Sequence, residues 1–544
     1  MKAFLAILFI MISTAPSVSQ DGHDSPAVYW ILFTDKGPNI ESRIRDLEPT
    51  LPEKTVERRR KAIGGGNIVD GRDLPVFEPY VESLKSMVSG IRERSRWLNA
   101  VSAELIPGNL KSIQSLAFVG GMEPLRSSDP MSARIEISET WKAGEKEYPH
   151  PAASLDYGRS FDQLEQIGAI RAHERGYHGE GVLICFLDTG FLTYHHAFDQ
   201  MDIVAEYDFI NDDNFVGFDP AQDLSGQPNH GTGCLGTIGG YYPGELIGPA
   251  FAASYILCKT EKSGSETAVE EDYYVAALEW GEFLGADVAS SSLSYSSWYE
   301  PEDLDGETAI TTIAANIAFE KGMILCSSMG NSGPGKFTLG APADSRLSLG
   351  IGGVQWNGEL YGSSSWGPTA DGRIKPDVSA RAVRTVAATP YTTDGFGFWN
   401  GTSLSCPLAA GAVALVIQAH PDWSPLMVRE AVKETASRAN CPDIRFGWGI
   451  INVEDAINYP SLAGYVADRN TGEALTTIVE MTNLDSGMKT TATTDESGYY
   501  LFANLEFGKY ELIIAGEGFL PYMRLLELPP SDEMDILLQP VDRY

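Results

Sequence analysis

The sequence predicts an α/β protein whose mostly parallel sheet carries helices on both faces, preceded by a small α+β unit and followed by a small β-sandwich. Between residues 156 and 458, short apolar runs alternate with helical stretches, which is typical of βαβ units. A mixed segment precedes this region, and a segment of short alternating runs follows it. A chain of 544 residues is long enough for about three such domains.

The N-terminus predicts an export signal over residues 1–19. Lys2 supplies a positive charge, and residues 3–12 form an apolar run that is too short for a stable membrane anchor. Small residues at positions 17–19 suit a signal peptidase. No other apolar run reaches the roughly 18 residues of a membrane span. We therefore expect a secreted protein (extracellular, periplasmic or at the cell surface) without a span once the signal is removed.

Residues 20–125 predict a small α+β unit. It opens on the strand-like run AVYWILFTD, continues with helical stretches at EKTVERRRKAI and around residues 79–93, and ends on RSRWLNAVSAELI, which alternates as a strand does. Residues 126–155 are polar, contain Pro and Ser, and show no sustained period. That composition predicts a linker or processing region.

The central region, residues 156–458, supplies the parallel sheet and its helices. The strand-like runs are GVLICFLDTG, SYILCKT, ADVASSSLSY and MILCSSMGNSG. Helical stretches begin at HGTGCLGTIGG and VEEDYYVAALEWGEFLG and lie near residues 308–321. Such a sheet carries its active site at the carboxyl ends of its strands, and polar motifs follow several of these runs.

Residues 461–544 predict a small antiparallel β-sandwich. Turn residues such as those at 470–472 and 496–498 separate the alternating runs LAGYVAD, TTIVEMTN, KTTATTD, YYLFANL, KYELIIAG and MDILLQP.

The charge distribution excludes some partners. Residues 21–150 contain 18 Lys and Arg against 20 Asp and Glu, whereas residues 151–544 contain 21 against 54. A strongly acidic surface is unsuited to nucleic acid or an anionic membrane, both of which need clustered Lys and Arg. Acidic groups can bind cations, but charge alone names no metal, so a structural calcium ion stays open and has no location in the sequence.

The six cysteines predict no metal site, because none forms a CxxC pair and no Cys/His metal spacing occurs. Cys185, Cys258 and Cys326 each lie in an apolar strand-like run, and we expect them to be buried and free. The sequence gives no disulfide pairing.

Four residues together suit the hydrolysis of a peptide bond, which needs a nucleophile, a base, a group that orients the base, and oxyanion donors. His230 stands in NHGTG, where small neighbours let a nucleophile approach the ring. Asp188 ends the run VLICFLD, where a buried carboxylate can hold an imidazole tautomer. Ser403 stands in NGTSLSCPLAAGAVAL at the start of a predicted helix, whose free N–H groups can stabilise an oxyanion. Asn331, in SSMGNSGP, can aim its amide at the same oxyanion.

Each of these residues alone has a plainer interpretation, such as a turn or a helix cap. The motif Asp-Thr-Gly also occurs in aspartic peptidases, but those need a second copy, which this sequence lacks. The order Asp, His, Ser decides among the interpretations, because several independent motifs follow in that order. With its motifs in this order, the region 156–458 resembles the subtilase family. The stretches SSSWGPTADGRIKPDVSA and FGWGIINVEDAI within this region also resemble that family.

The resemblance implies a subtilisin-like fold and a serine endopeptidase that acts through an acyl-enzyme. It implies that Ser403 is the nucleophile, His230 the general base and acid, and Asp188 the orienting carboxylate. Asn331 would donate to the oxyanion together with the Ser403 backbone N–H. No cofactor is implied for the chemistry. Two walls of a substrate cleft are also implied, formed by Ser292, Leu293 and Ser294, which would pair with substrate as an added strand, and by Ser328, Met329 and Gly330.

Three motifs depart from the family's common pattern. Gly233 stands where a second His often follows, Ser294 and Tyr295 replace a Gly of the substrate-binding strand, and Leu408 follows Pro407 in place of His. None of these positions belongs to the proposed triad. The change at Ser294 leaves the side-chain preference of the cleft open.

The flanking units carry resemblances of their own. Residues 20–125, beginning at YWILFTDKG, resemble the inhibitor-type propeptide of subtilases, and residues 461–540 resemble a carboxypeptidase-regulatory-like sandwich. A precursor is implied, in which the propeptide is an intramolecular inhibitor and the enzyme removes it by itself. The partners would then be protein or peptide substrates and this propeptide. The competing interpretations are a catalytically silent peptide-binding protein and a surface adhesion protein.

Overall fold

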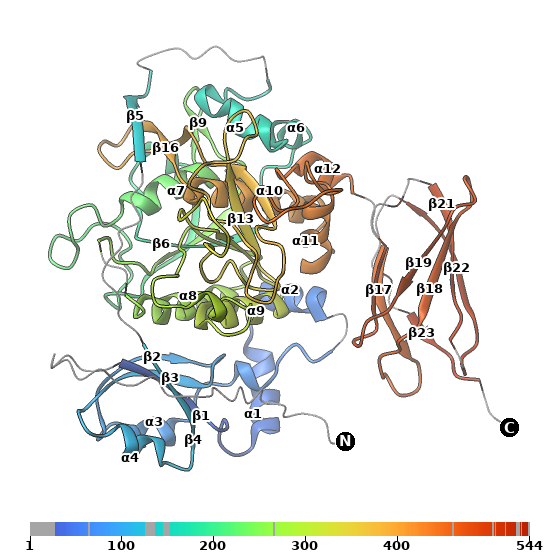
Figure 1. Cartoon of the computed structure of the whole chain (residues 1–544), viewed down its shortest axis with the longest axis horizontal. Coiled ribbons are helices and arrows are strands. Elements are labelled where there is room, and N and C mark those ends of the chain that lie inside the picture. Colours follow the sequence, from blue (N-terminus) through green and yellow to red (C-terminus); the bar gives the residue numbers. More distant parts are fainter. Residues whose placement is uncertain are drawn as a thin grey trace.

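The computed structural model forms three units along the chain: an N-terminal unit, a large central unit, and a C-terminal sandwich beside it (Figure 1). The structure describes residues 28–541 apart from a few short stretches, so the predicted export signal lies outside the described residues. The other stretches outside the described residues are 64–65, 126–135, 145–152, 265–266, 460–461, 503–504, 506–507, 517, 529–533 and 535.

The central unit is built on a seven-stranded sheet in the order β14-β13-β12-β11-β6-β10-β7. Every neighbouring pair is parallel, so the predicted parallel sheet is confirmed. Crossover helices cover both faces of such a sheet. Because the inner strands are then buried on both faces, their sequences are apolar along most of their length. The strands are β6 (Leu183–Asp188), β7 (Asp202–Asp208), β10 (Ser254–Lys259), β11 (Val288–Ser291), β12 (Ile324–Ser328), β13 (Leu349–Val354) and β14 (Val378–Arg381).

Strand β6 shows how the two faces are divided. Ile184 and Phe186 pack with helices α7 and α10, whereas Cys185 and Leu187 pack with α8 and α9 on the other face. Successive side chains of a strand point to opposite faces, so one apolar run serves two cores. The four helices are α7 (Asn229–Gly239), α8 (Glu270–Leu284), α9 (Ile310–Glu320) and α10 (Thr402–Ala419).

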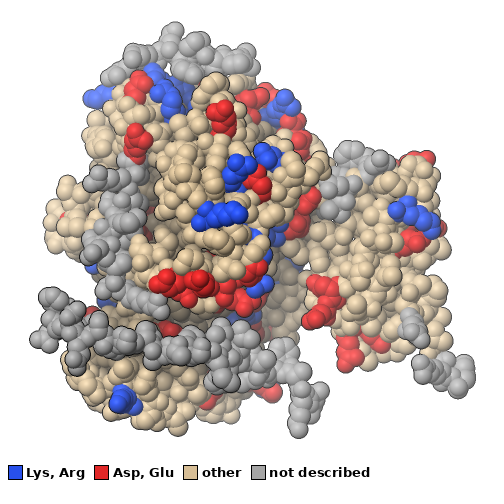
Figure 2. Space-filling model, in the orientation of Figure 1, with Lys and Arg blue, Asp and Glu red and all other residues tan. Residues whose placement is uncertain are grey.

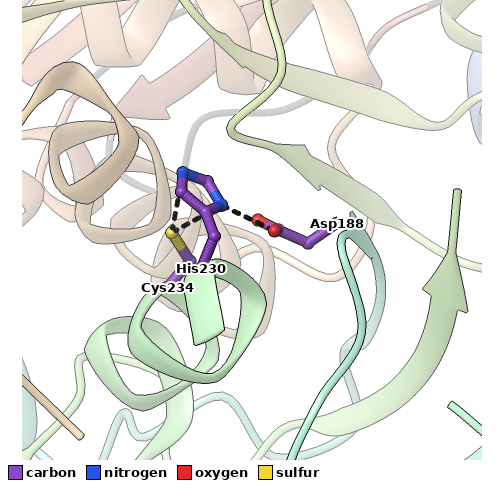
Figure 3. A group of neighbouring side chains, drawn as sticks. All are labelled: Asp188, His230 and Cys234. Carbon is purple, nitrogen blue, oxygen red and sulfur yellow. Dashed lines mark hydrogen bonds and ion pairs between the residues drawn. The ribbon is translucent and has the colours of Figure 1, made fainter. Parts of the chain in front are cut away.

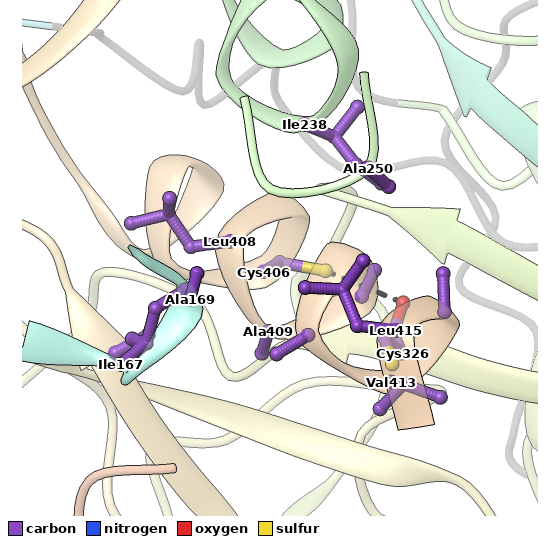
Figure 4. Close-up of a cluster of buried hydrophobic side chains, with 14 of the residues drawn as sticks. Ile167, Ala169, Ile238, Ala250, Cys326, Cys406, Leu408, Ala409, Val413 and Leu415 are labelled. Carbon is purple, nitrogen blue, oxygen red and sulfur yellow. Dashed lines mark hydrogen bonds between the residues drawn. The ribbon is translucent and has the colours of Figure 1, made fainter. Parts of the chain in front are cut away.

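Helix α10 runs through the larger core. Figure 4 shows its residues Cys406, Leu408, Ala409, Val413 and Leu415 among buried side chains of neighbouring elements. Among the described residues, α10 is the one helix long and apolar enough to cross a membrane, and 83% of it is buried inside the protein. Its apolar composition is therefore explained by its place in the core. Around it lie α5 (Phe161–Gln166), α6 (Ala169–Glu174), α11 (Pro425–Glu434) and α12 (Val453–Ile457).

The N-terminal unit is an antiparallel sheet in the order β2-β3-β1-β4 with helices. The helix predicted around residues 79–93 is wrong in its second half, because the chain turns after α3 and pairs with β3 as β2. Gly90 disfavours helix, and the pairing buries Val88. The elements are β1 (Val28–Phe33), α1 (Ile40–Leu47), α2 (Glu53–Ile63), α3 (Glu78–Leu84), β2 (Val88–Ser95), β3 (Ala100–Leu105), α4 (Leu110–Gln114) and β4 (Val119–Pro124).

The predicted linker is partly structured. Strand β5 (Glu136–Lys142) pairs antiparallel with β16 (Gly395–Asn400), next to β15 (Thr385–Ala388). Trp141 is buried there, and its indole N–H donates to Glu245 at 2.7 Å. This strand was not predicted, because its sequence is polar and lacks an alternating apolar pattern. Its partner strand also lies more than 250 residues further along the chain, so no local signal marks the pairing.

The C-terminal unit is a sandwich of the sheets β20-β17-β23 and β19-β18-β21-β22. Its sheets are antiparallel as predicted, except that β17 and β23 pair in parallel. Strand β22 was not predicted, because its side chains are mostly exposed and do not alternate. The strands are β17 (Leu462–Asp468), β18 (Ile478–Asn483), β19 (Lys489–Thr493), β20 (Tyr499–Phe502), β21 (Gly508–Ile514), β22 (Tyr522–Leu528) and β23 (Ile536–Leu538).

The N-terminal unit docks on helix α8 through buried carboxylates. Glu282 accepts hydrogen bonds from Arg58 and Arg59 of α2, all three side chains being almost fully buried. One turn earlier in α8, Glu279 accepts hydrogen bonds from the Ser95 hydroxyl and from the Trp97 backbone N–H. The central unit is acidic, and Figure 2 shows acidic side chains in a band across its visible face. The N-terminal unit therefore supplies donors to carboxylates that it buries.

Replacing Glu282 with Ala should destabilise the full chain, because the guanidinium groups of Arg58 and Arg59 would stay buried without a carboxylate. We expect the free energy of unfolding to fall by about 3–5 kcal/mol. The matched control is Glu320→Ala, whose side chain is 48% exposed where it pairs with Arg72. It should cost less than about 1 kcal/mol. Chemical denaturation measures both changes, and equal costs would contradict a structural role for the buried pairs.

Candidate active site

Asp188 and His230 meet at the carboxyl end of strand β6. His230 Nδ1 lies 2.6 Å from Asp188 Oδ1, which also accepts from the Thr189 backbone N–H at 2.7 Å (Figure 3). The Asp188 side chain is fully buried and that of His230 is 14% exposed. A buried carboxylate on Nδ1 fixes the proton there and leaves Nε2 as the basic nitrogen of the ring.

Glycines allow the close approach of β6 and α7. A Cβ on Gly231 would lie 2.3 Å from the Gly190 carbonyl oxygen and 3.0 Å from the Asp188 Cβ. At Gly233, where the family's second His is missing, a Cβ would lie 2.6 Å from the Trp399 ring. The indole of Trp399 therefore takes the space that a side chain at position 233 would need.

Two opposing effects set the pKa of His230. Burial disfavours the imidazolium and lowers the pKa, but the Asp188 carboxylate stabilises the positive charge. The attraction prevails, so the pKa of His230 stands well above its ordinary value. A base of that kind is charged, and unable to accept a proton, at mildly acidic pH.

Ser403 is the second residue of helix α10. Gly401 precedes the helix at φ 141°, a backbone conformation that favours glycine. Pro407 lies in the helix and has no N–H, so the Ser403 carbonyl lacks its usual partner four residues on. That carbonyl accepts instead from Ser292 Oγ at 2.8 Å and from Cys234 Sγ at 3.3 Å. Within the described residues, no hydrogen bond joins the Ser403 hydroxyl to His230, a contact that often tightens only with substrate.

Asn331 follows strand β12 and turns toward the start of α10. Its Oδ1 accepts from the Thr402 backbone N–H at 3.0 Å and from Thr402 Oγ1 at 3.1 Å. These two bonds fix the orientation of the amide, because only its oxygen can accept them. The Nδ2 group is then left to donate elsewhere. A Cβ on Gly401 would lie 3.7 Å from this nitrogen and 3.8 Å from the Ser403 backbone nitrogen.

Cys234 is a neighbour of the pair that sequence reasoning missed. Its Sγ lies 3.8 Å from His230 Nδ1 and 4.0 Å from Nε2, and these groups with the Asp188 carboxylate lie within 4.8 Å of one another (Figure 3). The donor set is one that could hold a thiophilic metal ion. The sequence signal was the spacing of four residues on one helix, which places His230 and Cys234 on the same face. Burial raises the pKa of the Cys234 thiol, so the group is neutral at ordinary pH.

The six residues predicted to bind substrate lie at the ends of β11 and β12, which are adjacent parallel strands. Ser292 Oγ donates to the Ser403 carbonyl, and the backbone N–H and C=O of Ser294 make no hydrogen bond in the described part of the chain. Ser328 Oγ donates to the Ser292 carbonyl at 3.4 Å. Met329 packs with Leu339 and Ala343 in a small buried cluster, and Gly330 is buried at φ 96°. The structure thus brings Ser292 against Ser403 and places the other five residues on the same two adjacent segments.

The chain matches three protein families along its length. Residues 179–449 match the subtilase family. Residues 28–139 match the peptidase S8 propeptide domain of Bacteroidota, and residues 461–539 match the carboxypeptidase regulatory-like domain.

Known subtilisins are similar to more than half of the chain. Subtilisin Savinase of Lederbergia lenta is 29% identical over 298 residues, which are 54% of this chain and 97% of that protein. Subtilisin amylosacchariticus of Bacillus subtilis subsp. amylosacchariticus is 26% identical over 370 residues, 67% of this chain and 82% of the relative. The crystal structure of fervidolysin from Fervidobacterium pennivorans, at 17% identity, shares the fold with a TM-score of 0.54 and covers 95% of this chain and 79% of fervidolysin.

The raised pKa of His230 predicts an acid limit to peptide hydrolysis. Because the protonated ring cannot accept a proton, kcat/KM should fall as the pH drops through a midpoint above about 6.5. Asp188→Asn should lower that midpoint and reduce kcat by at least about a thousandfold. His196→Gln, which changes an exposed ring, should leave the pH profile unaltered. A parent midpoint well below 6.5 would contradict the assigned role of Asp188.

Proposed function

Since the chain is a serine-type endopeptidase with a subtilase-family domain at residues 179–449, we propose that Asp188, His230 and Ser403 are its catalytic triad. The observation that carries the proposal is the buried 2.6 Å contact between Asp188 and His230. Cys234, on the helix of His230, contacts the carbonyl of Ser403, a serine at the N-terminus of α10. His230 Nε2 takes the proton of Ser403 Oγ as the hydroxyl attacks the scissile carbonyl, and later returns it to the leaving amine. Asp188 keeps the ring in the required tautomer and stabilises the imidazolium.

The oxyanion is held by the Ser403 backbone N–H and Asn331 Nδ2. Charge on the substrate oxygen appears only in the transition state, so these donors raise kcat more than they improve binding. The free backbone groups of Ser294 pair with the substrate as an added strand. No cofactor takes part in these steps.

The chain is made for export and loses its N-terminal unit by self-processing. Export is inferred from the signal-like sequence of residues 1–19. Self-processing is supported by the course of the chain at β5, where Glu136 pairs with Asn400, three residues before Ser403. The Asn400 amide also donates to Glu136 at 3.1 Å. The chain therefore enters the central unit beside its own nucleophile, after a connection, residues 126–135, that lies outside the described residues.

Loss of the oxyanion donor tests the role of Asn331. Asn331→Ala should lower kcat by about a hundredfold or more with little change in KM, the usual effect of removing one such donor. Asn357→Ala, at an exposed turn, is the matched control and should leave both constants unaltered. Steady-state kinetics on a peptide anilide measures the two variants, and an unchanged kcat for Asn331→Ala would refute the role.

Loss of the nucleophile tests both catalysis and processing. Ser403→Ala should abolish casein hydrolysis and accumulate near full length after signal removal. The parent chain should instead carry a new N-terminus within residues 121–155. Ser405→Ala, a change at a buried hydroxyl of the same helix, should be processed like the parent. Mass spectrometry of the N-termini decides, and identical N-termini in the parent and Ser403→Ala would mean that Ser403 does not make the cut.

A further inference from the structure

Three segments of the chain meet beside Ser403 around a narrow space, the slot, which the Ser294 hydroxyl occupies in part. Residues 292–294 follow β11. Ser328 ends β12, and residues 329–330 begin the loop after it. Residues 340–341 lie across from the first segment. Tyr295 and Ala341 exchange two backbone hydrogen bonds of 2.8 Å, which fixes the third segment against the first. Two facing positions of the slot are the buried glycines Gly330 and Gly340. Glycines add no side chain of their own to this space.

Both walls of the slot are tied to the turn that carries Ser403. On one side, Ser292 Oγ donates to the Ser403 carbonyl at 2.8 Å. On the other, Asn331 follows Gly330 directly and accepts from the Thr402 N–H at 3.0 Å. A substrate residue whose carbonyl faces Ser403 would lie between these two walls, where its side chain can enter the slot.

The side chain of Ser294 reaches between the two glycines. A Cβ on Gly340 would lie 2.3 Å from Ser294 Oγ, and a Cβ on Gly330 would lie 2.9 Å from the same oxygen. Ser294 is half-buried, and its hydroxyl makes no hydrogen bond within the described part of the chain. The space between the glycines is thus narrowed by a polar group that a large apolar side chain would bury without a partner.

We propose that Ser294 restricts this peptidase to substrates with a small residue, such as Ala, Ser or Gly, on the acyl side of the scissile bond. The proposal rests on the peptidase function proposed above. A small side chain leaves the Ser294 hydroxyl in contact with water or with a substrate hydroxyl. An aromatic or long aliphatic side chain would have to displace the Ser294 side chain from between Gly330 and Gly340.

The test uses two tetrapeptide anilides that differ only in the residue before the scissile bond, Ala or Phe. The parent should favour Ala in kcat/KM by about tenfold or more. Ser294→Gly should raise the Phe to Ala ratio of kcat/KM by about tenfold or more, because it opens the slot. Ser294→Ala, which removes only the hydroxyl, should raise the ratio less and keeps the test valid if the glycine variant fails to fold.

Ser297→Gly is the matched control, since the same substitution falls at an exposed position three residues away. It should leave the ratio unaltered. A parent chain that cleaves Phe as well as Ala would overturn the size restriction while the peptidase function stands. An unaltered ratio in both Ser294 variants would overturn the role of Ser294. Failure to cleave either anilide or casein would instead count against the peptidase function itself.

Discussion

The carbonyl of Ser403 is the point on which the geometry of the site depends. Because Pro407 lacks an N–H, this carbonyl cannot complete the helical hydrogen bond, and two other segments donate to it. Ser292 brings the segment after β11 to Ser403, and Cys234 brings the helix that carries His230. A buried carbonyl without donors would cost free energy, so the three segments are held in one arrangement.

Ion pairs and hydrogen bonds to buried carboxylates join the N-terminal unit to the central unit. Helix α8 presents Asp272, Glu279 and Glu282, which are buried under the N-terminal unit. Burial raises the pKa of Asp272 to about 7, whereas Arg58 and Arg59 offset burial and lower the pKa of Glu282. The central unit thus has three buried carboxylates at a surface that the N-terminal unit covers and partly neutralises. This fits a unit that belongs to the folding of the chain and that departs afterwards.

Much of the fold could be predicted because local patterns and tertiary structure agree. Apolar runs that end in Asp188 or Ser328 are buried on both faces of a parallel sheet, a strong signal in sequence. Strand β5 could not be predicted, because its pairing depends on a partner far along the chain. Nor could the place of Ser294 between two glycines, since it depends on packing between separate segments. The contact of Cys234 with His230 was not predicted although it did have a signal, their spacing of four residues on one helix.

Covalent labelling with a fluorophosphonate probe tests the central claim most directly, because only an activated serine reacts with it. The labelled residue is identified by mass spectrometry of the digested chain. The account predicts label on Ser403 of the parent chain and a loss of most labelling in His230→Ala. Label on a different serine, or undiminished labelling of Ser403 without His230, would contradict it.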